Sequence, residues 1–214
     1  GLDESTHAAR YASALGLEHN IEHVNPDQAL GMLDDVITSC GEPFADYSIF
    51  PTMLVSQLAR QQVTVMLSGD GGDELFWGYV GRFGSVIAKS QDFKHPFWLR
   101  SMQWGLKKVA NIGNGYPNLR IESIGAWYQA KHSHLPSSVL VDSFPDVAPA
   151  SLKLFEYRGW ETDKTAQWMR WNEFVGHLTR VLLKVDRASM YHSLEVRVPL
   201  LDREVIETAL RVDW

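Results

Sequence analysis

The chain has 214 residues, of which 45% are hydrophobic and 21% charged, and its formal net charge is −6. This composition is typical of a folded globular protein and excludes a disordered chain. No apolar run approaches the roughly 20 residues that span a bilayer, and the first residues lack the basic and apolar regions of a signal peptide. The single cysteine, Cys40, excludes a disulfide within the chain. We therefore expect a cytoplasmic protein that does not span a membrane.

The first ninety residues predict helices that alternate with strands. Apolar residues at helical spacing, with capping residues before them and glycine after them, predict helices over residues 3–16, 25–41 and 51–59. Residues 17–24 predict a strand. The apolar, β-branched run Val63–Leu67 predicts a strand that is buried on both faces of a parallel sheet. This alternation is typical of an open α/β layer, in which ligands bind beyond the carboxyl ends of the strands.

The rest of the chain predicts a mainly helical part. The spacing of apolar residues favours helices, and a Gly/Asn turn and a Pro/Ser connector separate them at residues 111–118 and 135–149. The predicted helices cover residues 96–110, 121–132, 150–160 and 163–184. We place a boundary near residue 90, with an α/β nucleotide-binding part over 1–90 and a helical part over 91–214.

A basic stretch lies in the helical part. The stretch from Lys94 to Lys131 contains six lysines and arginines but only one acidic residue, Glu122, and Trp98 and Trp104 lie among them in the sequence. This pattern would suit a nucleic-acid surface, but it is more typical of a solvated helical face whose aromatic residues belong to the core. We expect no nucleic-acid partner. Histidine pairs such as His132 and His134 lack a third metal ligand nearby and indicate surface or structural residues, and Cys40 is predicted to lie in the core.

The loop Ser68-Gly69-Asp70-Gly71-Gly72-Asp73-Glu74 follows the predicted strand at 63–67. Glycines let a backbone approach a ligand closely, and the amino end of the helix expected from Gly72 offers amide groups to an anion. Asp70, Asp73 and Glu74 would repel a phosphate, however, unless Mg²⁺ lies between the carboxylates and a polyphosphate. The loop therefore predicts a magnesium–nucleotide site. The alternative is a glycine-rich turn in which Asp70 caps a helix.

Two stretches resemble the synthetase domain of the glutamine-hydrolysing asparagine synthetase family. The run from Leu67 to Phe76 is similar to that family's core signature and departs from it at Trp77, where a glycine is usual. The runs from Leu183 to Met190 and from Ser193 to Asp202 are similar to a second signature. The resemblance extends from end to end and is weakest between about 91 and 150.

The resemblance implies a fold and a reaction. The fold would be a partial parallel sheet of the adenine nucleotide alpha hydrolase (PP-loop ATP pyrophosphatase) type, followed by a mainly helical part. In the family, ATP adenylates the side-chain carboxylate of aspartate, and ammonia derived from glutamine then attacks to give asparagine, AMP and pyrophosphate. Ser68 and Gly69 would contact ATP, Asp73 would hold Mg²⁺, and Asp70 would lie at the reacting centre. Gly71 and Gly72 would help to bind the nucleotide, and Glu74 would be a second metal ligand.

The second signature allows two interpretations. Lys184, Asp186 and Arg187 could approach the reaction intermediate. Alternatively, Asp186 could cap a helix while Glu195, Arg197 and Asp202 form an ion-pair network that braces helices. We keep both, and treat Lys184, Asp186 and Arg187 as candidate catalytic residues.

Parts of the family pattern are absent from the sequence. The Ser-Gly-Gly-x-Asp-Ser pyrophosphate loop and the glutaminase domain would precede Gly1, and the family's catalytic lysine would follow Trp214. We expect a fragment with an exposed sheet edge that favours association, including a homodimer, and with little activity of its own.

Two other functions remain open. A relative could adenylate another carboxylate, as β-lactam synthetases, lasso-peptide cyclases and cell-surface sugar amidotransferases do, and the departure at Trp77 and the weak resemblance over about 91–150 leave room for it. Trp77 could also narrow the pocket. The chain could also be a module that binds nucleotide without turnover.

Overall fold

The computed structural model describes residues 4–21, 23, 25–110, 121–133, 139, 142–146 and 153–214. The chain divides into two compact units: unit 1 comprises residues 1–68 and 181–197, and unit 2 comprises residues 69–180 and 198–214. The described residues are mostly helical and contain one parallel sheet of two strands. This grouping differs from the division predicted at residue 90, and that domain boundary remains a prediction.

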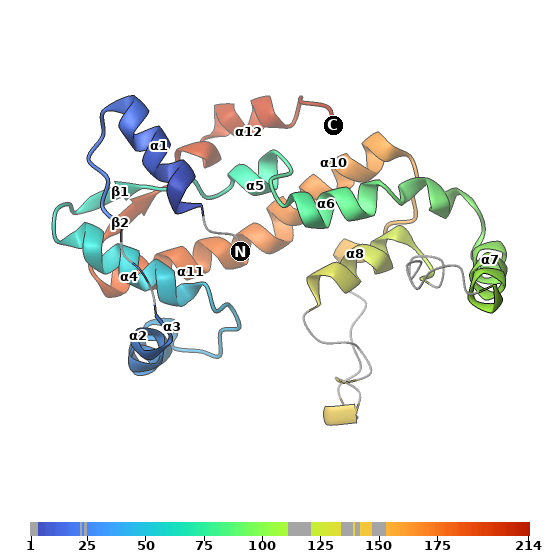
Figure 1. Ribbon diagram of the computed structural model, residues 1–214, viewed down its shortest axis with the longest axis horizontal. Coiled ribbons are helices and arrows are strands. Elements are labelled where there is room, and N and C mark those ends of the chain that lie inside the picture. The colour runs from blue at the N-terminus through green and yellow to red at the C-terminus, as the bar shows by residue number, and fades with distance from the viewer. Residues whose placement is uncertain are drawn as a thin grey trace. The chain divides into compact units, whose positions relative to one another are not determined.

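Unit 1 consists of helices and the small sheet (Figure 1). Its elements are α1 (Ser5–Leu15), α2 (Pro26–Gly31), α3 (Leu33–Cys40), α4 (Ile49–Arg60), β1 (Val65–Leu67), most of α11 (Leu178–Tyr191) and β2 (Glu195–Arg197). The helix expected over 25–41 is thus two helices that meet at Met32.

Local capping signals determine where these helices begin and end. The side chain of Asn25 accepts a hydrogen bond from the Gln28 amide at 2.8 Å, and the Gln28 side chain accepts one from the Asn25 amide at 3.1 Å. This is the capping box that the sequence predicts. Gly16 and Gly41 end α1 and α3 with φ of 65° and 66°, in the left-handed region that glycine adopts without a steric penalty.

The sheet differs from the sequence prediction in three ways. β1 pairs in parallel with β2, with Met66 opposite Val196, although no strand was predicted at 195–197. The strand predicted over 17–24 is absent from residues 17–21 and 23, and residues 22 and 24 lie outside the described set. Val65 and Leu67 are 39% and 67% exposed, so the expected burial of both faces is wrong for the described chain. Such burial requires strands on both sides and helices over both faces, which two strands do not provide.

Unit 1 has a small core of its own. Val36, Cys40, Ile49, Met53 and Ala188 are buried against one another, on α3, α4 and α11. Cys40 is 3% exposed, which confirms that it is a core residue.

Unit 2 is helical. Its elements are α5 (Gly72–Leu75), α6 (Val80–Ile87), η1 (Ser90–Lys94), α7 (Phe97–Val109), α8 (Ile124–His132), η3 (Lys153–Phe155), α10 (Thr162–Asn172), the π-helical turn η4 (Glu173–His177), the start of α11, η5 (Pro199–Leu201) and α12 (Arg203–Ala209). The helix predicted over 150–160 is reduced to η3 among the described residues. The carbonyl of Tyr157 instead accepts a hydrogen bond from Gly125 at 3.0 Å, and the Tyr157 ring stacks on Trp168 with a centroid distance of 4.4 Å.

The core of unit 2 lies between α6, α8 and α10, and Figure 1 shows α6 running beside α10. Phe83, Ile124, Tyr128 and Met169 contribute fully buried side chains to it. Among the described residues, no helix is both long enough and apolar enough to cross a membrane.

The basic stretch does not behave as a uniform solvated face. Arg100 on α7 is 2% exposed and donates hydrogen bonds to the carbonyls of Ile121 and Glu122, both at 2.9 Å. Trp98, expected in the core, is 64% exposed. Arg100 is buried because it lies on the side of α7 that faces the protein interior. There its guanidinium donates hydrogen bonds to backbone carbonyls that would otherwise lack donors.

The contacts of two helical glycines predict opposite effects of an added methyl group. A Cβ on Gly125 would lie 1.9 Å from the carbonyl oxygen of Phe155, whereas a Cβ on Gly84 would meet no atom within 4 Å. We expect Gly125→Ala to destabilise the protein by about 1–3 kcal/mol. Gly84→Ala should stabilise it by up to about 1 kcal/mol, through helix propensity. Chemical denaturation measures both, and equal effects of the two variants would contradict this packing.

Candidate functional site

The glycine-rich loop begins at the end of β1. The amide of Ser68 donates to the carbonyl of Arg197 at 2.9 Å, which continues the parallel pairing by one residue. Gly71 has φ of 87°, and α5 begins at Gly72, as predicted. Ser68 belongs to unit 1, whereas residues 69–74 belong to unit 2. A strand, a tight turn and a short helix therefore follow one another in the order that the sequence predicts.

Leucine side chains lie close against two of the three glycines. A Cβ on Gly71 would lie 2.4 Å from Cδ2 of Leu201, and one on Gly72 would lie 3.0 Å from Cδ1 of Leu200. A Cβ on Gly69 would meet no atom within 4 Å. Gly71 and Gly72 therefore let the second signature pack against the first, and Gly69 leaves the loop backbone accessible.

The three loop carboxylates lie in different environments. Asp73 is exposed and Asp70 is half-buried, whereas Glu74 is 1% exposed. The hydroxyl of Tyr79 donates to Oε1 of Glu74 at 2.7 Å, and burial raises the pKa of Glu74 above its ordinary value. Asp73 is thus more accessible to a metal ion than Glu74.

The surroundings of Asp73 fit a magnesium ligand. A Cβ on Gly78 would lie 1.9 Å from Oδ1 of Asp73, so glycine is needed there to leave room for the carboxylate. Carboxylate oxygens such as those of Asp73 are the ligands that Mg²⁺ prefers.

The candidate residues of the second signature lie in unit 1, on α11. Nζ of Lys184 donates to Oγ of Ser48 at 3.0 Å, and Asp186 is exposed. Nη1 of Arg187 donates to the carbonyl of Cys40 at 2.9 Å, at the end of α3. A cation at a helix C-terminus is stabilising, so Arg187 has a structural role within unit 1.

The bracing network that was the alternative for this signature forms only in part. Asp186 lies inside α11 and does not cap it, because the helix begins at Leu178. Glu195 and Arg197 form an exposed ion pair at 2.8 Å. Asp202 caps α12 by accepting a hydrogen bond from the amide of Glu204 at 2.9 Å.

The sequence suggested that the Trp77 side chain lines the pocket beside the loop, but the structure buries it. It is 7% exposed, and its Nε1 donates to the carbonyl of Ala166 at 2.8 Å. The guanidinium of Arg170 lies 4.4 Å from its ring centroid, and Trp214 makes an edge contact at 5.5 Å. Its φ is 55°, a left-handed value that explains why glycine suits this position. Trp77 therefore packs into unit 2, and the prediction that it narrows the pocket loses its basis.

No pattern in the sequence predicted the buried network of hydrogen bonds and ion pairs around Glu173. Glu173 is 0% exposed, and its Oε1 accepts from Nη1 of Arg82 at 2.8 Å and from the hydroxyl of Tyr128. Nε2 of His132 lies 3.0 Å from the same oxygen. The one available signal was the i, i+4 pair of Glu173 and His177, and it is common on exposed helices.

His132, Glu173 and His177 resemble a metal site, since their ligand atoms all lie within 4.8 Å of one another. Arg82, however, binds the carboxylate, and Nη2 of Arg180 lies 3.0 Å from Nδ1 of His177. Two guanidinium groups already supply the positive charge that a metal ion would bring. We therefore interpret the cluster as an ion-pair network.

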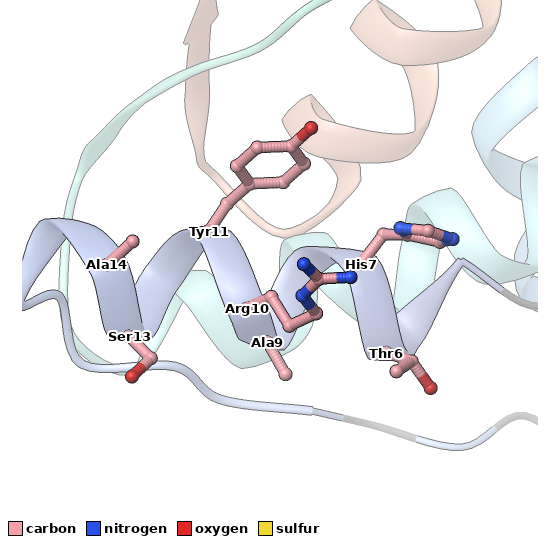
Figure 2. A pocket seen from close by; sticks show the side chains of 7 residues that line it. All are labelled: Thr6, His7, Ala9, Arg10, Tyr11, Ser13 and Ala14. Carbon is pink, nitrogen blue, oxygen red and sulfur yellow. The ribbon is translucent and has the colours of Figure 1, made fainter.

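A surface hollow lies along α1 and contains none of the predicted site residues. Seven residues of this one helix line it, and Figure 2 shows Tyr11 pointing to one side of the helix and Ser13 to the other. A single helix cannot enclose a ligand, so this hollow is an open surface.

Comparisons with known proteins agree with the two signatures. The profile of the family described as asparagine synthase matches residues 1–214. Putative asparagine synthetase [glutamine-hydrolyzing] of Mycobacterium tuberculosis H37Rv is 29% identical over 99% of the chain and 34% of its own length. Asparagine synthetase [glutamine-hydrolyzing] 1 of Bacillus subtilis is 26% identical over 99% of the chain and 35% of its own length.

An archaeal relative is also similar. Putative asparagine synthetase [glutamine-hydrolyzing] 2 of Methanocaldococcus jannaschii is 33% identical over 70% of the chain and 30% of its own length. The chain thus spans about a third of the length of these relatives. No solved structure is significantly similar to it.

The backbone of Trp77 predicts a measurable difference between two substitutions. Trp77→Ala and Trp77→Gly both remove the buried indole, which should destabilise the protein by about 3–5 kcal/mol. At φ of 55° an alanine retains the left-handed strain that glycine relieves, so Trp77→Gly should be the more stable variant by about 1–2 kcal/mol. Chemical denaturation of both variants tests this, and a more stable alanine variant would contradict the backbone conformation.

Acid should destabilise unit 2 through Glu173 and His177. Burial opposes ionisation of Glu173, but the contacts with His132, Tyr128 and Arg82 outweigh it and lower the pKa to about 2. Burial lowers the pKa of His177 to about 4. In both cases the unfolded state binds the proton at a higher pH than the folded state, so stability is lost as the pH falls.

The loss of folding stability should occur in two pH ranges. The His177 contribution should disappear between about pH 6.5 and pH 4, and the Glu173 contribution between about pH 4.5 and pH 2, each on the order of 3 kcal/mol. Denaturation at a series of pH values measures the slope. His177→Asn should flatten the upper window, and an unchanged slope in that variant would contradict this account.

Proposed function

Because the chain belongs to the asparagine synthase family, we propose that it forms the ATP-dependent synthetase part of an enzyme that makes asparagine from aspartate. The side-chain carboxylate of aspartate would attack the α-phosphate of ATP and release pyrophosphate. Ammonia, supplied from glutamine, would then attack the activated carbonyl carbon and release AMP. The observation that carries this proposal is the loop 68–74, which leaves a parallel strand and turns through Gly71 into α5.

The loop residues would bind the nucleotide and its metal. Ser68 and Gly69 would contact ATP, and the open surroundings of Gly69 support a close approach of its backbone. Asp73, exposed beside Gly78, would hold Mg²⁺, which when bound neutralises the charge of pyrophosphate. Asp70 would lie at the reacting centre. Glu74 was expected as a second ligand, and its burial and its bond to Tyr79 favour a supporting role.

Lys184 and Asp186 remain candidates for contact with the reacting groups. Lys184 is held by Ser48, and Asp186 is exposed. Arg187, which binds a backbone carbonyl, is the least available of the three predicted residues. Because positioning and charge neutralisation dominate reactions at phosphorus, a lysine that approaches the intermediate would suit this chemistry.

The whole protein would contain further parts. A glutaminase domain would supply ammonia, and the pyrophosphate loop and the family's catalytic lysine would complete the ATP site, so residues 1–214 alone would have little activity. The exposed edge of β1 would favour association, including a homodimer. A cytoplasmic location would suit such an enzyme.

A related enzyme that adenylates another carboxylate is the alternative. The departure at Trp77 first suggested it, but this side chain is buried against Ala166 and Arg170. The alternative therefore has no support from this residue, and a panel of carboxylate substrates would distinguish the two enzymes. A module that binds Mg-ATP without forming AMP is a further alternative.

Removal of the Asp73 charge should abolish the reaction. In the protein at its natural length, with Mg-ATP, aspartate and ammonia, Asp73→Asn should lower AMP formation at least about 100-fold, because it removes a metal-binding oxygen and a charge. Chromatography of the nucleotides measures AMP.

The matched control is Asp163→Asn, an exposed aspartate in the first turn of α10, which should retain wild-type activity. AMP formation by Asp73→Asn at the wild-type rate would refute the metal role of Asp73. Absence of AMP with aspartate in the wild type, together with its formation from another carboxylate, would refute the substrate.

A further inference from the structure

A chain of contacts connects the nucleotide loop with the interior of unit 2. The hydroxyl of Tyr79 donates to Glu74 at 2.7 Å, and the guanidinium of Arg82 lies 4.7 Å from the centroid of the Tyr79 ring. The same guanidinium donates to Glu173 at 2.8 Å. Glu74 follows Asp73 directly, so the network ends at the residue next to the proposed metal ligand.

Glu173 is the fixed end of this chain. It is completely buried, its Oε1 is bound by Arg82 on α6 and by Tyr128 on α8, and His132 is within ion-pair distance. Partners from two helices hold the carboxylate in one place. Loss of its charge would leave the half-buried guanidinium of Arg82 without its counter-ion, which is strongly unfavourable in a protein interior.

The backbone at Glu173 is also unusual. Residues Glu173–His177 form a π-helical turn between α10 and α11, and this turn packs against α5. The π-helical turn is rare and is frequently found at functional sites. It places Glu173 beside Arg82 and His177 beside Tyr79. The rings of His177 and Tyr79 are in edge-on contact, with their centroids 5.3 Å apart.

We infer that Glu173 is a positioning residue for the proposed reaction: through Arg82 and Tyr79 it fixes Glu74 and α5, and so holds Asp73 in the orientation that binds magnesium with the nucleotide. This inference rests on the proposed function for the identity of the ligand. Glu173 itself would touch neither substrate nor metal.

The test measures magnesium-dependent nucleotide binding by the natural-length protein. The probe is a non-hydrolysable ATP analogue, titrated with and without Mg²⁺. Tyr79→Phe removes one hydroxyl and cuts the network at Glu74, while Glu173→Gln removes the buried charge. Both should weaken binding of the magnesium complex about tenfold and binding of the metal-free analogue much less, and Glu173→Asp should restore part of the difference.

The control is Glu207→Gln, which removes the same charge from the exposed ion pair between Glu207 and Arg203, and which should leave binding unchanged. Thermal unfolding shows which variants remain folded, and Tyr79→Phe keeps the test decisive if Glu173→Gln does not fold. Folded variants that bind the magnesium complex as the wild type does would overturn the inference. So would equal weakening with and without Mg²⁺, which indicates a general structural role.

The failure of the proposed function would look different. If the wild type binds the magnesium complex but forms no AMP with aspartate, the reaction is wrong and the binding data still decide the role of Glu173. If the wild type binds no nucleotide, both are overturned.

Discussion

The ion pair between Glu173 and Arg82 is the interaction on which unit 2 depends most. A fully buried carboxylate needs donors, and here the donors to Oε1 come from α6 and α8 while the acid comes from the turn after α10. These three elements must therefore pack in one arrangement for the donors to reach Oε1. Because Tyr79 and Glu74 continue the same contacts to α5, the arrangement of the core also determines where the loop helix lies.

A second constraint acts on the loop from the other signature. Leu200 and Leu201 approach Gly71 and Gly72 so closely that a side chain there would have to displace them. The end of the second signature thus packs against the glycines of the first within unit 2, and among these glycines only Gly69 keeps open space around its backbone. The three glycines therefore have different roles: Gly71 and Gly72 allow close packing, and Gly69 leaves room for a ligand.

The features that were predicted correctly from the sequence are those set by residues close together in the chain. The Asn25–Gln28 capping box and the glycine ends of α1 and α3 depend on neighbouring residues alone, and the structure contains them. The turn at residues 68–74 was predicted from its glycines, although Leu200 and Leu201 also constrain it. A strand depends on a partner, so the strand predicted over residues 17–24 is wrong for the described residues 17–21 and 23, and the strand at residues 195–197 was missed. The network around Glu173 was missed because nothing near it in the sequence indicates which helices bring it donors. Trp77 shows the same limit: its burial follows from contacts with Ala166 and Arg170, about ninety residues away.

The loop at residues 68–74 is proposed to serve the adenylation of a carboxylate. The most direct test labels the side-chain carboxylate of aspartate with oxygen-18 and analyses the products of the natural-length protein by mass spectrometry. Attack of the carboxylate on the α-phosphate leaves one of its oxygens on AMP when ammonia displaces the nucleotide. We expect AMP that carries one labelled oxygen. Labelled inorganic phosphate together with ADP, or AMP without label, would contradict it.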